Sequence, residues 1–90
     1  MTIQQLRYIL TVAERGSITE AAKDLYISQP GLSGAVKKVE KEVRLTIFKR
    51  CRAGISLTPE GLEFLDYARQ VVQKMEALES RYMGGPPERT

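Results

Sequence analysis

Residues 17–33 read SITEAAKDLYISQPGLS, and this stretch decides the fold. It begins with Ser17-Ile18-Thr19-Glu20, a capping box in which the serine hydroxyl accepts an early helix N–H while the glutamate reaches back. Ser28 is the next N-cap, and Pro30 stands in the first turn of the following helix, where its missing N–H is not needed. Because only two or three residues separate the helices, they meet at a steep angle. The spacing predicts a helix-turn-helix, with an ordinary corner between two helices as the alternative.

The flanking sequence predicts one more helix before this pair. Thr2-Ile3-Gln4-Gln5 is another capping box, apolar residues recur after it at helical spacing, and Gly16 supplies a left-handed C-terminal cap. We therefore expect helices over about residues 3–15, 18–25 and 28–43. The buried face of the third helix is predicted to hold Leu32, Val36, Val39 and Val43.

Beyond the third helix, the hydrophobic period changes from helical to alternating. Residues 45–50 (LTIFKR) and 55–57 (ISL) are typical of two short strands, and the turn between them contains Gly54. The hairpin over residues 45–57 carries three basic residues, Lys49, Arg50 and Arg52. The predicted fold is mainly α: a winged helix-turn-helix, with a three-helix core and a small β-hairpin wing, followed by a long helix.

That long helix begins at Thr58-Pro59-Glu60, with an N-cap, a proline at the first position and an acid in the first turn. Its apolar residues form two rows along the helix, and each row needs its own surface to pack against. We expect one row to contact the same helix of a second chain as a dimer interface: Leu65, Ala68, Val72 and Met75. The alternatives are the second row, which is Phe64, Val71 and Leu78, and a single intramolecular core that covers both rows.

Charge is concentrated in the middle third of the chain. The whole chain carries 14 basic and 11 acidic residues, a net charge of +3. Residues 28–58 alone hold seven basic and two acidic residues, a net charge of +5. This distribution indicates a local anionic partner, with a solvated helix face as the alternative.

Composition excludes several function classes. The 90 residues contain no histidine and one cysteine, Cys51, so we expect no zinc site, no Ser-His-Asp arrangement, no disulfide framework and no cofactor. Scattered carboxylates form no catalytic set, so an enzyme is the weakest hypothesis. A redox role for Cys51 beside two arginines is the alternative to an inert thiol. No stretch is apolar enough for a membrane span, which fits a cytoplasmic protein.

The solvent face of the third helix has the composition of a major-groove reader. Short polar groups suit base edges, and cations further along the helix suit phosphates. The candidates for DNA contact on this face are Gln29, Pro30, Ser33, Lys37 and Lys38. The helix N-termini at Ser17 and Ser28 can also bind a phosphate oxygen, although capping alone is the alternative for both serines.

Four segments together resemble the N-terminal domain of LysR-type transcriptional regulators: residues 21–33, Val39-Glu40, Phe48-Lys49-Arg50 and residues 57–61. The likeness covers about residues 2–83. It implies a winged helix-turn-helix, a linker helix that pairs two chains antiparallel, and transcriptional control by binding double-stranded DNA at interrupted palindromes. In that family a larger domain that senses a small-molecule effector follows. We expect this sequence to be a fragment without that domain.

The resemblance also assigns roles to residues. It implies base reading by Gln29, Pro30 and Ser33, and phosphate contacts near Ser17, Lys37, Arg50 and Arg52. The position after Ser33 is often an arginine in the family, but here it is Gly34, which supplies no contact. Arg44 stands where the family often has a glycine that ends the helix, which leaves the C-cap of the third helix open.

These observations divide the chain into three parts. Residues 1–58 are the predicted winged helix-turn-helix domain, residues 59–83 the linker and dimerisation helix, and residues 84–90 a hinge tail. The competing hypothesis is a winged-helix module whose basic face binds an acidic protein. Basic residues on both the third helix and the hairpin favour DNA.

Overall fold

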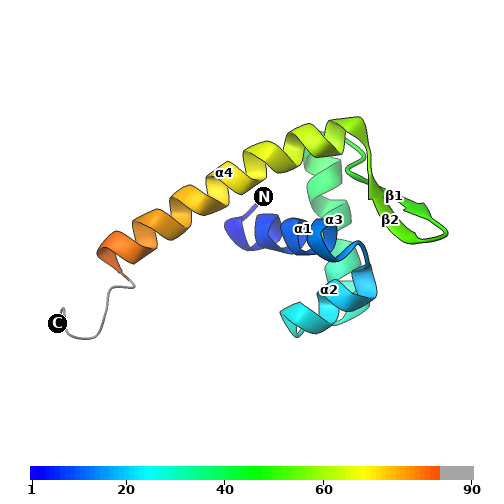
Figure 1. Cartoon of the computed structure of the whole chain (residues 1–90), viewed down its shortest axis with the longest axis horizontal. Coiled ribbons are helices and arrows are strands. Elements are labelled where there is room, and N and C mark those ends of the chain that lie inside the picture. Colours follow the sequence, from blue (N-terminus) through cyan, green and yellow to red (C-terminus); the bar gives the residue numbers. More distant parts are fainter. Residues whose placement is uncertain (84–90) are drawn as a thin grey trace.

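The computed structural model describes residues 1–83, so the predicted hinge over residues 84–90 lies outside the described residues. The elements are α1 (Ile3–Arg15), α2 (Ile18–Leu25), α3 (Gln29–Val43), β1 (Phe48–Cys51), β2 (Gly54–Leu57) and α4 (Pro59–Tyr82). Helices α1, α2 and α3 gather on one side of α4, the hairpin projects at one end, and α4 extends well beyond the bundle (Figure 1). The predicted fold class is confirmed.

Local caps set the helix boundaries. Thr2 forms the complete capping box with Gln5, and both N–H···O distances are 3.0 Å. Ser17 accepts the backbone N–H of Glu20 at 3.2 Å, but the carboxylate of Glu20 pairs with Arg15 at 3.1 Å instead of reaching back. The predicted second box is therefore only half formed, because a nearby guanidinium is a stronger partner for a carboxylate than a backbone amide.

Two helices end at residues other than glycine in the left-handed region. Tyr26 ends α2 and Arg44 ends α3, each with φ 57°, while Gly16 ends α1 as predicted. The Arg44 N–H donates to the carbonyl of Glu40, which closes the last turn of α3. Arg44 therefore takes the C-cap position that the sequence left open, at a backbone cost of about 1–2 kcal/mol for a residue with a Cβ.

The main core lies where the three short helices meet α4 and the segment before the hairpin. Ala21 and Ala22 are buried on α2, and their small side chains let α3 cross closely. Val43, the fourth residue of the face predicted for α3, is only partly buried. The fully or nearly fully buried residues of this cluster are Ile9, Val12, Ala21, Ala22, Leu32, Val36, Val39, Ile47 and Leu65.

The first strand is shorter than the alternating pattern predicts. β1 begins at Phe48, and it pairs antiparallel with β2 in the register Phe48 to Leu57 and Cys51 to Gly54. Residues 45–47 lie outside the strand because Ile47 gives its N–H to a partner outside β2. Its N–H donates to the Glu40 carboxylate at 2.7 Å, and its carbonyl accepts the Thr58 N–H at 3.0 Å.

The predicted dimer row requires correction. Leu65, Ala68 and Val72 are 2%, 3% and 6% exposed, because α4 lies along α1 and covers its apolar side. Met75, the fourth member, is half-buried. The row is therefore part of the intramolecular core, and it does not offer a free face to a second chain.

An ion-pair network extends the contact between α1 and α4. The guanidinium of Arg7 lies 3.0 Å from a carboxylate oxygen of Glu76 and 3.5 Å from one of Glu79. These groups are exposed enough that solvent screens them, so the network directs α4 more than it stabilises the fold.

Two glycines on different helices give a matched pair for testing the packing. A Cβ at Gly61 would overlap the backbone carbonyl of Ile47, whereas a Cβ at Gly34 meets nothing within 4 Å. We expect Gly61→Ala to lower the free energy of unfolding by about 1–3 kcal/mol through overpacking. Gly34→Ala should raise it by up to about 1 kcal/mol, since alanine favours the helix. Urea unfolding followed by far-ultraviolet circular dichroism measures both, and shifts of the same sign would contradict the packing described.

Candidate nucleic-acid interface

The predicted reading residues lie along one side of α3. The Ser28 hydroxyl accepts the Gly31 N–H at 3.0 Å and fixes the start of the helix. Gln29 and Pro30 are exposed in the first turn, and Ser33 is half-buried one turn later. Lys37 and Lys38 follow in the middle of the helix and are exposed.

Three elements converge around two adjoining hollows beside α3. The larger, of about 190 Å³, is lined by Ser17 at the start of α2, Gln29 and Ser33 of α3, and Arg50 of β1. The smaller, of about 80 Å³, shares Ser33 and Arg50 and adds Lys37. Five of the predicted contact residues, separated by up to 33 positions in the sequence, therefore line these two hollows, which share Ser33 and Arg50. The predicted contact residues that line neither hollow are Ser28, Pro30, Lys38 and Arg52.

The hairpin reaches this position through the turn between α1 and α2. The N–H of Ile55 donates to the carbonyl of Gly16 at 3.1 Å. Gly54 has φ +128°, and a Cβ there would lie 2.6 Å from the same carbonyl oxygen, so only glycine allows this approach. Ile55 is the cross-strand partner of Arg50, and anchoring β2 on Gly16 therefore brings Arg50 beside Ser17.

The cations of this face differ in their pairing from several cations elsewhere in the described part of the molecule. Arg7, Arg15, Lys23 and Arg69 each form an ion pair with a carboxylate. By contrast, within residues 1–83 no carboxylate pairs with the cations of α3 and the hairpin, which are Lys37, Lys38, Lys41, Lys49, Arg50 and Arg52. Unpaired cations around a depression, with the N-terminus of α2 at its edge, make a surface for an anion with spaced charges.

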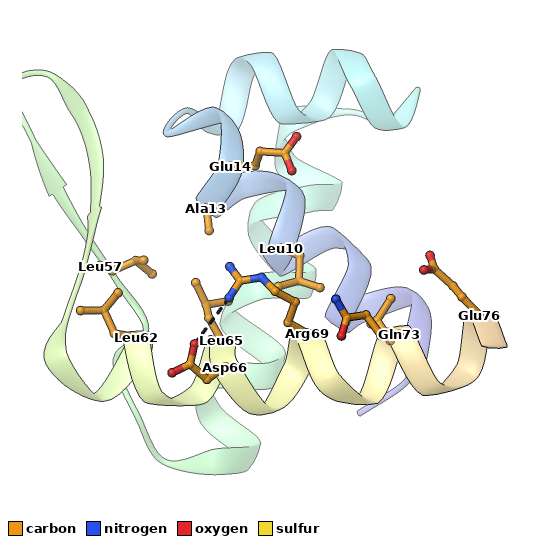
Figure 2. A pocket seen from close by; sticks show the side chains of 11 residues that line it. Leu10, Ala13, Glu14, Leu57, Leu62, Leu65, Asp66, Arg69, Gln73 and Glu76 are labelled. Atoms are coloured by element: carbon orange, nitrogen blue, oxygen red, sulfur yellow. Dashed lines mark hydrogen bonds and ion pairs between the residues drawn. The ribbon is translucent and has the colours of Figure 1, made fainter. Parts of the chain in front are cut away.

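A third hollow lies between α1 and α4 and has a different character (Figure 2). Its volume is about 450 Å³, and its walls combine leucines with the carboxylates of Glu14, Asp66 and Glu76. Among the residues 1–83 that line it, the cation is Arg69, which lies 3.5 Å from Asp66. This hollow is acidic, and no local sequence pattern indicates it because its walls come from α1, β2 and α4, which are far apart in the chain.

Other site types are not found in the described part of the chain. Residues 1–83 contain no group of three His, Cys, Asp or Glu side chains that would hold a metal ion. Cys51 is an exposed free thiol at the end of β1. None of the described helices has the length and apolarity that crossing a membrane requires.

Comparison with known proteins identifies the family. The family model of bacterial regulatory helix-turn-helix proteins of the lysR family matches residues 3–62, which include α1, α2, α3 and the hairpin. The chain belongs to the LysR family. The resemblance inferred from the sequence is thereby confirmed.

Relatives of this LysR-family chain are transcriptional regulators. It is similar to the uncharacterized HTH-type transcriptional regulator YcgK of Bacillus subtilis (strain 168), with 38% identity over 78 residues, which are 87% of this chain and 24% of that protein. It is also similar to the HTH-type transcriptional regulator ClcR of Pseudomonas putida, with 38% identity over 76 residues, which are 84% of this chain and 26% of that protein. The chain thus spans about a quarter of the length of these curated relatives.

Solved LysR-family structures share the fold. The crystal structure of a complex between the CbnR DNA-binding domain and DNA matches with a TM-score of 0.84 and 33% identity, over 90% of this chain and 93% of that one. The complex of the BenM DNA-binding domain with its catB site 1 DNA matches with a TM-score of 0.84 and 34% identity, over 89% and 86% of the two chains.

Binding to an immobilised polyanion tests whether the unpaired cations form the anion-binding face. We expect Arg50→Ala to elute from heparin at lower salt than the parent chain, because Arg50 lines both hollows and no carboxylate within residues 1–83 neutralises it. Arg69→Ala removes the same charge from a paired arginine on the acidic side and should change the elution much less. Equal shifts for the two variants would mean that only net charge matters.

Proposed function

We propose that the chain binds double-stranded DNA sequence-specifically, as the DNA-binding domain of a LysR-type transcriptional regulator. In this proposal α3 lies in the major groove and the hairpin contacts the neighbouring backbone. The observation that carries it is the convergence of Ser17, Gln29, Ser33 and Arg50 around one hollow, while Arg50 and Lys37, which pair with no carboxylate within residues 1–83, line the hollow beside it. The DNA complexes of the similar CbnR and BenM domains support the same partner. Since bacterial DNA lies in the cytoplasm, so does the proposed site of action.

Each side chain has a chemical role in the proposed complex. Gln29 pairs through its amide with adenine N6 and N7, and Pro30 offers an apolar contact to a thymine methyl. Ser33 hydrogen-bonds to a base edge with little preference. The helix N-termini at Ser17 and Ser28 and the basic residues bind phosphates, which supply affinity without sequence information. The basic residues are Lys37, Lys38, Arg50 and Arg52.

The first experiment selects binding sites from a random duplex library at near-physiological salt, then titrates the winner against its scrambled version. Enrichment of a two-fold symmetric site supports a dimeric sequence reader. Uniform, salt-sensitive binding without enrichment would contradict sequence-specific reading and favour the module that binds an acidic protein.

Two substitutions distinguish recognition of the base sequence from overall affinity for DNA. We expect Gln29→Ala to cost about 1–3 kcal/mol on the selected site and to relax preference at one base pair. Arg52→Ala, at the exposed turn of the hairpin, should weaken matched and scrambled duplexes alike. Fluorescence anisotropy titrations on both duplexes measure the difference. If the two variants behave identically on the two duplexes, the reading role of Gln29 is wrong.

The proposed assembly is a homodimer through the outer side of α4. Val71 and Leu78 are 45% and 50% exposed, Tyr67 and Tyr82 are exposed beside them, and Phe64 is half-buried at the same edge. These residues fall near one line along the helix at about 100° per residue. We therefore place the dimer interface on the second apolar row of α4, which contains Phe64, Val71 and Leu78, and not on the buried row. Its partner is α4 of a second copy of the chain.

We expect Val71→Glu to shift the chain toward monomer and to weaken binding to a two-fold symmetric site, because a carboxylate would be buried against an apolar face. Gln70→Glu is the control, since it adds the same charge at an exposed position about 100° away around α4. Sedimentation equilibrium measures the association. A Val71→Glu chain that dimerises as tightly as the control would contradict this interface.

A further inference from the structure

Glu40 is an acid on the basic side of the molecule, and it joins α3 to the hairpin. Its Oε2 accepts the backbone N–H of Ile47 at 2.7 Å and that of Phe48 at 3.1 Å. Ile47 is the last residue of the connection between α3 and β1, and Phe48 is the first residue of β1. Two N–H groups on one carboxylate oxygen are charge-assisted hydrogen bonds, which are stronger than neutral ones.

The position of Glu40 makes this contact more than a local cap. Glu40 lines the same hollow as Lys37 and Arg50, which are proposed phosphate contacts. A carboxylate beside phosphate-binding cations opposes the binding of DNA through its charge. The backbone hydrogen bonds are therefore the favourable contribution of this residue, and they act on the segment that starts the hairpin.

Each strand of the hairpin donates a backbone hydrogen bond to another element, in addition to the packing of Phe48, Ile55 and Leu57 against the core. On β2, Ile55 donates to the carbonyl of Gly16. On β1, Phe48 donates to Glu40, and Arg50 follows two residues later on the same strand. Fixing the N–H of Phe48 therefore fixes the direction in which the strand carries Arg50 and, at the turn, Arg52.

We propose that Glu40 is a positioning residue for DNA binding: it holds the hairpin in the place where its arginines meet the backbone beside α3. It touches no DNA itself. This inference rests on the proposed function. It says that Glu40 affects how many phosphates the hairpin contacts, and not which base sequence α3 reads.

The test compares three substitutions in the 90-residue chain by measuring the dissociation constant on matched and scrambled duplexes from low to high salt. Glu40→Ala removes the acceptor and the charge. Glu40→Gln removes the charge but keeps an oxygen acceptor. Glu42→Ala removes a carboxylate of the same helix that pairs with the terminal amine of Met1 and not with the hairpin.

We expect Glu40→Ala to bind more weakly at low salt, with a log–log salt slope smaller in magnitude by about 1 to 2, since each lost phosphate contact removes about 0.9. Its ratio of matched to scrambled affinity should stay that of the parent, because α3 still reads the bases. Glu40→Gln and Glu42→Ala should keep the parent slope and bind at least as tightly. If the charge alone mattered, Glu40→Ala would also bind at least as tightly, and that result overturns the proposal.

A double substitution tests whether Glu40 acts through the hairpin. When Arg50→Ala is already present, adding Glu40→Ala should cost less than it does in the parent chain, because one of the contacts that Glu40 positions is gone. Additive losses would assign Glu40 a structural role only and overturn the proposal. Amide hydrogen exchange supplies the structural readout, with protection lost at Ile47 and Phe48 and kept at Ile55 in a folded Glu40→Ala chain.

Three further outcomes are distinguishable. If Glu40→Ala does not fold, Glu40→Asp decides, since its shorter side chain withdraws the acceptor while keeping the charge; an unchanged salt slope in that variant overturns the proposal. If the parent chain itself binds no duplex, the proposed function fails first and the inference about Glu40 fails with it. A parent that binds while Glu40→Ala keeps its slope leaves the proposed function standing and removes only the inference.

Discussion

The peptide groups around Ile47 hold the three parts of the molecule together. The Ile47 N–H bonds to the Glu40 carboxylate of α3, and its carbonyl accepts the N–H of Thr58, the cap of α4. Its side chain is fully buried in the core, and the backbone of Gly61 lies against its carbonyl. These contacts tie α3 and the start of α4 to the residue that directly precedes β1. Burial of Ile47 stabilises the arrangement by about 2 kcal/mol or more, since a large apolar side chain leaves water.

The direction of α4 follows from the same junction and from the apolar side of α1. Thr58 fixes where α4 begins, and Leu6 then packs against Ala68 and Val72 further along. An apolar helix face packs against the nearest apolar surface, and for α4 that surface is α1 of the same chain. The adjacent face of α4 stays exposed at Val71 and Leu78, so intramolecular packing decides which face remains for a second chain.

The sequence predicts features that depend on neighbours within four positions. The caps Thr2, Ser17, Ser28 and Thr58 each accept the backbone N–H three residues later, as their positions indicated, and the helix boundaries follow from them. Features that depend on distant partners were missed. The hairpin strand starts at Phe48, and not earlier, because the Glu40 carboxylate takes the N–H of Ile47, and no local pattern reports that contact. The dimer row was wrong for the same reason, since heptad spacing says that a face is apolar but not which surface covers it.

Within the proposed interface, local contacts position some residues and contacts between distant parts of the chain position others. The first turn of α3 is placed by its own cap, so the geometry of Gln29 depends on a hydrogen bond between Ser28 and Gly31. The position of Arg50 depends instead on two contacts that cross the fold, through Glu40 and Gly16. Base reading and phosphate binding are therefore supported by separate sets of interactions. In the proposed complex, a change at Glu40 or Gly16 would therefore alter affinity through the position of Arg50, while the sequence preference would still depend on the first turn of α3.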